Sequence, residues 1–419
     1  MNGFQYYTPT KVVFGKDTEH QAGALVREFG GTKVLVHYGK GSVKRSGLLD
    51  RVFQSLDEAG IPWVELGGAV PNPHLSLVHE GIELCKKEGV DFILAVGGGS
   101  AIDSAKAIGY GVKYDGEVWD FYEKIAVAKD SVPVGVVLTL AATGSEMSNS
   151  SVITNEEGWL KRGYSSDLGR PKFAIMNPEL TYTLPEYQTM SGCVDIMMHT
   201  MERYFTPTDT DTSLTDRIAE GLMVSVRDAA QVAVKEPENY EARATLMWAG
   251  SLSHNGLTGA GRVSDFGTHK IEHELGGMFD VAHGAGLAAV WGSWARYVYK
   301  TNPGRFAQFG KKVFGINISS STNITPNSDA PEQPIKPSPI ITDPELTSTD
   351  TAALAAITAW ETWCHSISMP TTLTELGIHP TDAQIEEMAE KCVFGRNGHV
   401  GFFQPLTKGD IVAILKMAK

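Results

Sequence analysis

DFILAVGGGSAIDSAKAIG (91–109) is the stretch that decides the fold. Its first half is a short apolar run of the kind that forms a buried strand, and its second half has the composition of a helix. Three glycines join the halves. Glycine lets the backbone approach a ligand closely, and free N–H groups at a helix N-terminus attract an anion such as a pyrophosphate. The stretch predicts a phosphate-binding turn, although a tight turn without a ligand is the alternative. The candidate cofactor contacts are Gly97, Gly98, Gly99, Ser100 and Asp103.

The same alternation of strand and helix runs through the first 185 residues. Apolar runs at 33–39 and 63–70 are strand-like, and the segments 46–60 and 77–89 have helical periodicity. Alternation of this kind predicts a mostly parallel sheet with helices on its faces. The β-branched and aromatic runs at 4–8 and 11–15 flank Pro9, and from them we expect an N-terminal hairpin.

A second loop, GKGSVKR (39–45), also follows a strand. In a doubly wound sheet such a loop tends to meet the adenosine end of a nucleotide. It contains no acidic residue to hold a ribose 2′-hydroxyl, whereas its basic and hydroxyl side chains suit a 2′-phosphate. The loop therefore favours NADP(H) over NAD(H), with a solvated basic loop as the alternative. The candidate contacts are Gly39, Gly41, Ser42 and Lys44.

A third loop, TLAATGSEMS (139–148), follows the apolar run VGVVL. Hydroxyls at the end of a strand can bond a phosphate, a ribose or a nicotinamide carboxamide. Small polar residues are common in any loop, so the position after a third strand is what strengthens this signal. The candidate contacts are Thr139, Thr143 and Ser145.

After Pro185 helical periodicity dominates and strand-like runs become scarce. We therefore expect two domains, an α/β Rossmann-like dinucleotide-binding domain over 1–185 and an all-α domain over 186–419. The stretch 317–350 is rich in Ser, Thr, Asn and Pro, and it cannot bury enough apolar surface to fold alone. It is predicted to be a surface insertion loop.

The helical half contains a candidate metal site in the segments DIMMH (195–199) and HKIEHELGGMFDVAH (269–283). Asp195 and His199 are four residues apart, and so are His269 and His273. Each pair therefore shares a face of a helix if its segment is helical. One carboxylate with three neutral imidazoles suits a borderline divalent metal such as Fe(II) or Zn(II), usually with a position left open for chemistry. The candidate ligands are Asp195, His199, His269 and His283.

A rival interpretation concerns the same region. Residues 269–273 read HxxEH, the inverted zinc-protease motif, in which Glu272 would be the general base and His269 and His273 would bind zinc. This short pattern arises by chance. It also leaves Asp195, His199 and the glycine loops unexplained.

Amino-acid composition indicates which classes of binding partner and which cell compartment are compatible with this chain. Hydrophobic residues make up 42% of the 419 residues and charged residues 20%, as in ordinary globular proteins. A formal net charge of −13 argues against nucleic acid or an anionic membrane surface as the main partner. We expect neither a membrane span nor a secretory signal. The four cysteines lack motif spacing, which fits reduced thiols in the cytoplasm.

Taken together, these segments resemble the iron-containing (group III) alcohol dehydrogenase family over nearly the whole chain. GGGSAIDSAK is similar to its pyrophosphate loop, and AATGSEMS and YTLP to its nicotinamide-side segments. GCVDIMMHTMERYF and HKIEHELGGMFDVAHGAGLA resemble its metal-ligand signatures. YGKGSVKRSG is most similar to the NADPH-linked butanol dehydrogenase and aldehyde reductase branch, except that Lys40 stands where that branch usually has glycine.

The resemblance implies the dehydroquinate synthase-like architecture, with Asp195, His199, His269 and His283 as ligands of Fe(II) or, next, Zn(II). It also implies that Lys161 reaches the cofactor ribose and that His273 lies beside the nicotinamide without binding metal. We expect reduction of short-to-medium chain aldehydes such as butanal, with NADP(H) preferred and NAD(H) possible, in a homodimer. His273 is the candidate proton relay. The alternatives are a polyol dehydrogenase or a lyase on the same fold, a peptidase, and a catalytically silent nucleotide-binding protein.

Overall fold

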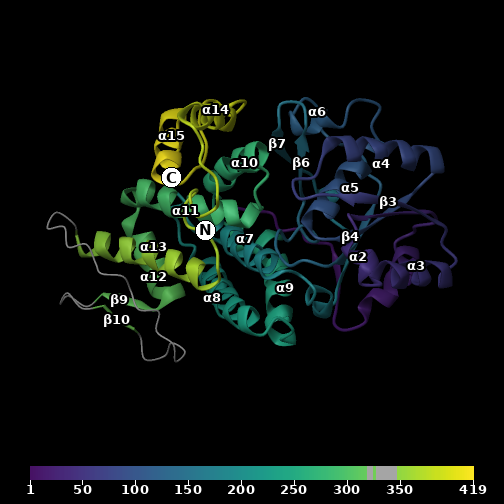
Figure 1. Ribbon diagram of the computed structural model, residues 1–419, viewed down its shortest axis with the longest axis horizontal. Coiled ribbons are helices and arrows are strands. Elements are labelled where there is room, and N and C mark those ends of the chain that lie inside the picture. Colours follow the sequence, from purple (N-terminus) through teal and green to yellow (C-terminus); the bar gives the residue numbers. More distant parts are fainter. Residues whose placement is uncertain (319–323, 327–346) are drawn as a thin grey trace. The chain divides into compact units, whose positions relative to one another are not determined.

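The computed structural model describes residues 1–318, 324–326 and 347–419 (Figure 1). The chain divides into two compact units. The sheet unit comprises residues 6–185 and 236–257, and the helical unit comprises residues 1–5, 186–235 and 258–419. The chain leaves the sheet unit after Pro185 and returns to it for helix α9 (Tyr240–His254), whose helical periodicity had suggested the second domain.

The sheet unit is built on six parallel strands in the order β1-β8-β5-β4-β2-β3. The predicted parallel sheet is therefore confirmed. The expected N-terminal hairpin is wrong, because residues 4–8 form no strand and β1 pairs in parallel with β8, with Lys11 opposite Phe173. The strands are β1 (Lys11–Phe14), β2 (Val34–Gly39), β3 (Trp63–Ala69), β4 (Phe92–Gly97), β5 (Val134–Leu138) and β8 (Phe173–Met176).

Helices and one antiparallel hairpin complete this unit. The hairpin joins β6 (Ser150–Asn155) to β7 (Leu160–Ser165). Besides α9, the helices are α1 (Ala22–Glu28), α2 (Ser42–Arg45), α3 (Leu48–Glu58), α4 (Leu75–Glu88), α5 (Gly99–Val112) and α6 (Trp119–Tyr122), with the 3-10 turns η1 (Thr18–Gln21), η2 (Asp167–Gly169) and η3 (Pro178–Thr181).

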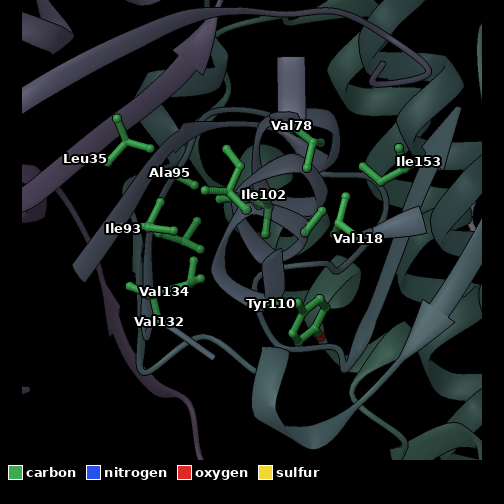
Figure 2. Packing of buried hydrophobic residues seen from close by; sticks show 14 of the residues in the cluster. Leu35, Val78, Ile93, Ala95, Ile102, Tyr110, Val118, Val132, Val134 and Ile153 are labelled. Atoms are coloured by element: carbon green, nitrogen blue, oxygen red, sulfur yellow. The ribbon is translucent and has the colours of Figure 1, made fainter. Parts of the chain in front are cut away.

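The core lies on both faces of the sheet because successive side chains of a strand point to opposite sides. Ile93 and Ala95 of β4 pack into a cluster with Ile102 of α5, which Figure 2 shows from close by. Phe92 and Leu94 belong to a second cluster, with side chains of α1 and α3. Burying each large aliphatic side chain contributes about 1.5–3 kcal/mol. Helices on both faces identify the doubly wound arrangement expected of a Rossmann-like domain.

The helical unit surrounds an aromatic core that includes Trp291, Trp294, Trp360 and Phe306, all buried. Its helices are α7 (Glu186–Tyr204), α8 (Ser213–Lys235), α10 (Gly267–Phe279), α11 (His283–Val298), α12 (Pro303–Phe314), α13 (Ser348–Ser366), α14 (Asp382–Val393) and α15 (Lys408–Met417). Short 3-10 turns occur at η4 (Leu257–Gly259) and η5 (Tyr299–Thr301). Among the helices that the structure describes, none is long and apolar enough to cross a membrane.

Most of the predicted insertion, residues 319–323 and 327–346, lies outside the described residues. The described residues on either side of these gaps form regular secondary structure. Strand β9 (Ile316–Ile318) pairs antiparallel with β10 (Ile324–Pro326). Thr347 then caps α13, because its side chain and that of Asp350 form a reciprocal capping box. Residues 347–350, assigned to the loop by composition, are thus the start of a helix.

Candidate metal centre and cofactor-binding loops

Three helices of the helical unit bring the predicted metal ligands together. Asp195 and His199 lie one turn apart on α7, His269 is in the first turn of α10, and His283 begins α11. Oδ1 of Asp195 lies 3.1 Å from Nδ1 of His199, 3.9 Å from Nε2 of His269 and 3.7 Å from Nε2 of His283. Asp195, His199 and His269 offer ligand atoms that all lie within 4.8 Å of one another.

Two buried polar atoms at this point test whether the residues fit a metal. Oδ1 of Asp195 and Nε2 of His269 make no hydrogen bond within the described part of the chain. Leaving a buried polar atom unsatisfied costs about 1–3 kcal/mol. Both atoms face the same small space as His199, and an oxygen with imidazole nitrogens is a donor set for Fe(II) or Zn(II). The residues therefore fit a divalent metal.

The Nδ1 atom of each candidate histidine has its own acceptor. Nδ1 of His199 is 3.0 Å from the carbonyl oxygen of Asp195. Nδ1 of His269 is 3.0 Å from Oε1 of Glu202, and Nδ1 of His283 bonds to Oε2 of Glu272. With Nδ1 engaged, Nε2 is the nitrogen that each ring offers to a metal.

These contacts also argue against the peptidase interpretation. Glu272 is fully buried and bonds to His283, so its carboxylate is not presented to a water in an open position. The compact group of Asp195, His199 and His269 includes neither His273 nor His283, but Nε2 of His283 lies 3.7 Å from Oδ1 of Asp195, and the ring centroid of His273 lies 5.9 Å from that of His283.

Burial sets the charge of these groups. It lowers the pKa of both His199 and His269 to about 4, which keeps their imidazoles neutral at pH 7. Burial works to raise the pKa of Asp195, but His199 and His283 outweigh it and hold that pKa well below its usual range. A carboxylate and neutral imidazoles are the protonation states that metal binding requires.

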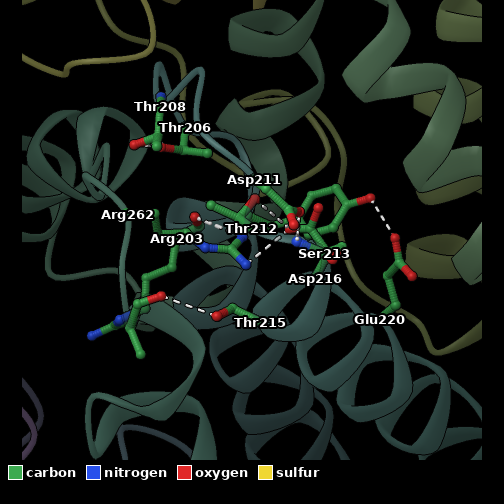
Figure 3. Close-up of polar contacts among 12 residues, drawn as sticks. Arg203, Thr206, Thr208, Asp211, Thr212, Ser213, Thr215, Asp216, Glu220 and Arg262 are labelled. Atoms are coloured by element: carbon green, nitrogen blue, oxygen red, sulfur yellow. Dashed lines mark hydrogen bonds and ion pairs between the residues drawn. The ribbon is translucent and has the colours of Figure 1, made fainter. Parts of the chain in front are cut away.

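The C-terminal end of α7 is fixed by a cluster of polar contacts (Figure 3). Nη1 of Arg203 donates to the carbonyl oxygen of His199 at 2.5 Å. Nη1 of Arg262 donates to the carbonyl oxygen of Arg203, while its Nη2 lies 2.8 Å from Oδ1 of Asp216 on α8. These contacts hold the turn of α7 that carries His199.

In the sheet unit, the three predicted cofactor loops follow neighbouring strands. Strand β4 pairs with β2 on one side and β5 on the other, and all three are parallel, so their carboxyl ends share one edge. The chain order reverses between β2 and β4, which makes that edge a topological switch point, where doubly wound sheets bind nucleotides. These ends carry Gly39, Gly97 and Thr139. The N–H of Thr139 donates to the carbonyl oxygen of Gly97 at 3.1 Å.

The glycine turn before α5 is tightly packed. Helix α5 begins at Gly99 and has no side-chain cap at Gly98. The N–H of Ala101 donates to the carbonyl oxygen of Gly98 at 3.1 Å, so the N–H groups of Gly99 and Ser100 are those that an anion can reach. A Cβ added to Gly99 would lie 2.5 Å from the hydroxyl oxygen of Thr143, so a larger residue would displace the Thr143 side chain. Ser100 occupies the first turn of the helix.

Asp103 and Ser145, both predicted to contact cofactor, bond to each other. The Ser145 hydroxyl donates to Oδ1 of Asp103 at 2.5 Å, and the N–H of Val152 donates to Oδ2 at 2.9 Å. Sequence reasoning did not select Lys106, yet its buried Nζ donates to the carbonyl oxygens of Ser145 and Ser150, both at 2.8 Å. This network ties the loop after β5 to helix α5.

The 39–45 loop meets an acidic residue that sequence reasoning missed. Gly41 has a φ of +152°, and Ser42 and Lys44 lie in the short helix α2. Nζ of Lys44 lies 3.3 Å from Oε2 of Glu65 on β3. The loop itself has no carboxylate, but the adjacent parallel strand supplies one.

Lys161, expected from the resemblance to reach the ribose, is buried on β7 opposite Thr154 of β6. The same hairpin carries Val152, whose N–H bonds to Asp103 at the start of α5. Lys161 therefore belongs to the part of the sheet unit that adjoins the glycine turn.

Both units of the chain match the models of a known protein family. Residues 9–178 match the family described as iron-containing alcohol dehydrogenase, and residues 189–334 match the C-terminal region of the same family. The chain belongs to the iron-containing alcohol dehydrogenase family. As a member of this family it is an oxidoreductase of the alcohol dehydrogenase class.

Relatives in the iron-containing alcohol dehydrogenase family resemble the chain over 90% or more of its length. It is 38% identical to the probable NADH-dependent butanol dehydrogenase 1 of Bacillus subtilis, over 99% of both chains. It is 35% identical to the NADPH-dependent aldehyde reductase YqhD of Escherichia coli, over 90% of each. A crystal structure of the NADH-dependent butanol dehydrogenase A from Thermotoga maritima matches with a TM-score of 0.89 and 36% identity, covering 100% of this chain and 99% of that one.

Proposed function

We propose that the protein is a metal-dependent alcohol dehydrogenase or aldehyde reductase that acts on short-to-medium chain aldehydes such as butanal with NAD(P)H. One observation carries the proposal: Asp195 and His269 turn buried, unbonded ligand atoms toward each other beside His199. When bound, the metal supplies a Lewis acid for the carbonyl oxygen, and the nicotinamide supplies the hydride.

The residues of the chain have separate tasks in this proposal. Asp195, His199, His269 and His283 hold the metal, and Fe(II) is proposed before Zn(II). The side chain of His283 is 24% exposed, whereas the other three are between 3% and 5% exposed, so substrate approaches from the side of His283. The N-terminus of α5 holds the pyrophosphate, with the hydroxyls of Thr139 and Thr143 nearby.

The proposal is tested by NADPH oxidation with butanal after anaerobic reconstitution with Fe(II), with NADH and Zn(II) in parallel. We expect turnover that disappears on chelation and returns when metal is added. Bound metal without turnover under any pairing would overturn the aldehyde substrate and favour a polyol or lyase reaction on this fold.

His273 is proposed to move the proton that the product oxygen needs. It is buried on α10, and its ring is tilted by 46° to that of His283. Replacing His273 with alanine should slow turnover about 100-fold, which is the usual contribution of a positioned acid or base, while metal stays bound. Turnover and metal content are measured together. His79→Ala, on α4 and paired with Glu117, serves as the control. Loss of metal from His273→Ala would make His273 a ligand and contradict this role.

The choice between NADPH and NADH is proposed to depend on the Lys44–Glu65 pair. Ser42 and Lys44 remain the proposed partners of a 2′-phosphate, which gives NADPH its predicted preference. The Glu65 carboxylate opposes that preference, because it neutralises Lys44 and repels phosphate. Among the relatives of this chain, one is named as NADH-dependent and another as NADPH-dependent, so the family includes both cofactor preferences.

Glu65→Gln should therefore raise the ratio of kcat/KM for NADPH to that for NADH about fivefold, as expected for one exposed charge worth about 1 kcal/mol. The effect should shrink at high ionic strength. Fluorescence titration with each cofactor checks binding without turnover. Glu58→Gln, an exposed change on α3, is the matched control. An unchanged ratio would place the 2′-phosphate elsewhere.

A homodimer and a cytoplasmic location are also proposed. Strand β1 is one of the two edge strands of the sheet. Its last residue, Phe14, is exposed, and so are Tyr6 and Tyr7, which precede the strand. An edge strand flanked by exposed aromatic rings is a surface that a second copy can cover. Light scattering of the purified protein checks the dimer, since a monomer mass of 45.3 kDa would contradict it. Cell fractionation checks the location.

A further inference from the structure

Two buried glutamates bond to the candidate ligands on the side away from the proposed metal. Glu202 lies two turns after Asp195 on α7 and is 3% exposed. Its Oε1 accepts from the backbone N–H of His269 at 2.9 Å and lies 3.0 Å from Nδ1 of the same residue. One carboxylate oxygen therefore fixes both the start of α10 and the orientation of the His269 ring.

Glu272 makes the corresponding contact with His283. It lies on α10, is fully buried, and bonds through Oε2 to Nδ1 of His283. Gly286 on α11 leaves the room for it, because a Cβ there would lie 3.0 Å from Cγ of Glu272. His199 differs from the other two histidines, since its Nδ1 bonds to a backbone carbonyl one turn earlier and needs no carboxylate.

We propose that Glu202 and Glu272 are positioning residues for the metal, each holding one imidazole in the Nδ1–H tautomer with Nε2 turned toward Asp195. This inference rests on the proposed metal-dependent function. A ligating imidazole that donates to a carboxylate is fixed in orientation and is a stronger donor, and removing such a partner typically weakens metal binding about 10-fold to 100-fold. This role also accounts for Glu272 in the HxxEH segment, so that segment does not require a peptidase function.

The geometry distinguishes this role from a merely structural one. Glutamine at either position has nearly the same size as glutamate but no charge. Its amide N–H₂ can also face Nδ1, which would favour the tautomer with hydrogen on Nε2 and block the metal. Replacement should therefore act on metal affinity and on the coordination spectrum, more than on folding.

The experiment uses the full-length protein stripped of metal and titrated with Co(II) and Zn(II) against a chromophoric chelator. For E202Q and E272Q we expect Kd values about 10-fold to 100-fold weaker than for the wild type, with altered visible absorption bands of the bound Co(II). The control is E220Q, because Glu220 is a buried carboxylate on α8 that accepts from Tyr204 and Gln308 and touches no ligand. Its Kd and spectrum should match the wild type.

The outcomes separate the two proposals. Wild-type protein that binds neither metal would overturn the proposed function itself. Wild-type binding with unchanged Kd and Co(II) spectrum in both glutamine variants would overturn the positioning role alone. Circular dichroism of the stripped variants monitors folding. If E202Q loses its helical signal, E272Q decides the matter, because Glu272 bonds to the side chain of its ligand, Nδ1 of His283, whereas Glu202 also bonds to the backbone N–H of His269.

Discussion

Asp195→Asn should remove bound metal and lower kcat for butanal reduction about 1,000-fold. The substitution keeps the shape of the side chain but removes the only carboxylate in the compact ligand group, and Oδ1 has no other bonding partner in the described chain. A Lewis acid contributes several kcal/mol to stabilising charge that develops on oxygen, and about 4 kcal/mol corresponds to this factor. Steady-state kinetics and metal analysis by mass spectrometry measure both effects.

The matched control for this change is Asp228→Asn, an exposed carboxylate on α8 that pairs with Arg227. It should retain metal and rate. Full activity of Asp195→Asn without bound metal would contradict the metal-dependent mechanism, whereas full activity with metal would show that the histidines suffice as ligands.

Lys106→Met should lower the free energy of unfolding by about 3–5 kcal/mol, the range seen when one partner of a buried charged network is removed. The Nζ of Lys106 is fully buried and donates to Ser145, Ser148 and Ser150. Methionine fills the space of the lysine stem but leaves these acceptors buried and unsatisfied. We expect the midpoint of thermal unfolding to fall by about 10 °C, as measured by calorimetry.

The Lys106 effect should also depend on pH. Burial, partly offset by Asp103, lowers the pKa of Lys106 to about 8, from 10.5 for an ordinary lysine. Between these values the unfolded chain binds more protons than the folded one, so wild-type stability gains relative to Lys106→Met as pH rises from about 8 toward 10.5. Lys113→Met, at the exposed end of α5, is the control. A constant difference between wild type and Lys106→Met over this range would show that burial does not lower the pKa of Lys106.

The features that could be predicted from the sequence are those that depend on neighbours along the chain. Alternating strands and helices, the glycine turn before α5 and the pairing of Asp195 with His199 on one helix face all follow from local spacing. His283 was a candidate ligand from its chemistry and its place after the glycine break, and it lies near Asp195 because α7 and α11 pack together.

The features that could not be predicted depend on distant partners. Strand β1 was assigned to a hairpin because its parallel neighbour β8 comes some 160 residues later. Glu65 reaches Lys44 across two parallel strands, so a search of the loop alone could not find it. The interior position of Lys106 was equally hidden, because a lysine on an ordinary amphipathic helix is exposed. Thr347 and Asp350 have the spacing of a capping box and could have predicted the start of α13, but the loop was assigned from the composition of the whole segment.

The excursion of the chain into α9 has a consequence for dissecting this protein into fragments. Met247 of α9 belongs to the same apolar cluster as Ile93, and the Ser251 hydroxyl donates to the buried carboxylate of Glu146. A gene truncated after Pro185 would encode the whole parallel sheet, yet it would expose this apolar surface to water and remove the Ser251 partner of Glu146. Domain swaps between homologues therefore need residues 236–257 to come from the same parent as the sheet, so the recombination unit is discontinuous in the gene.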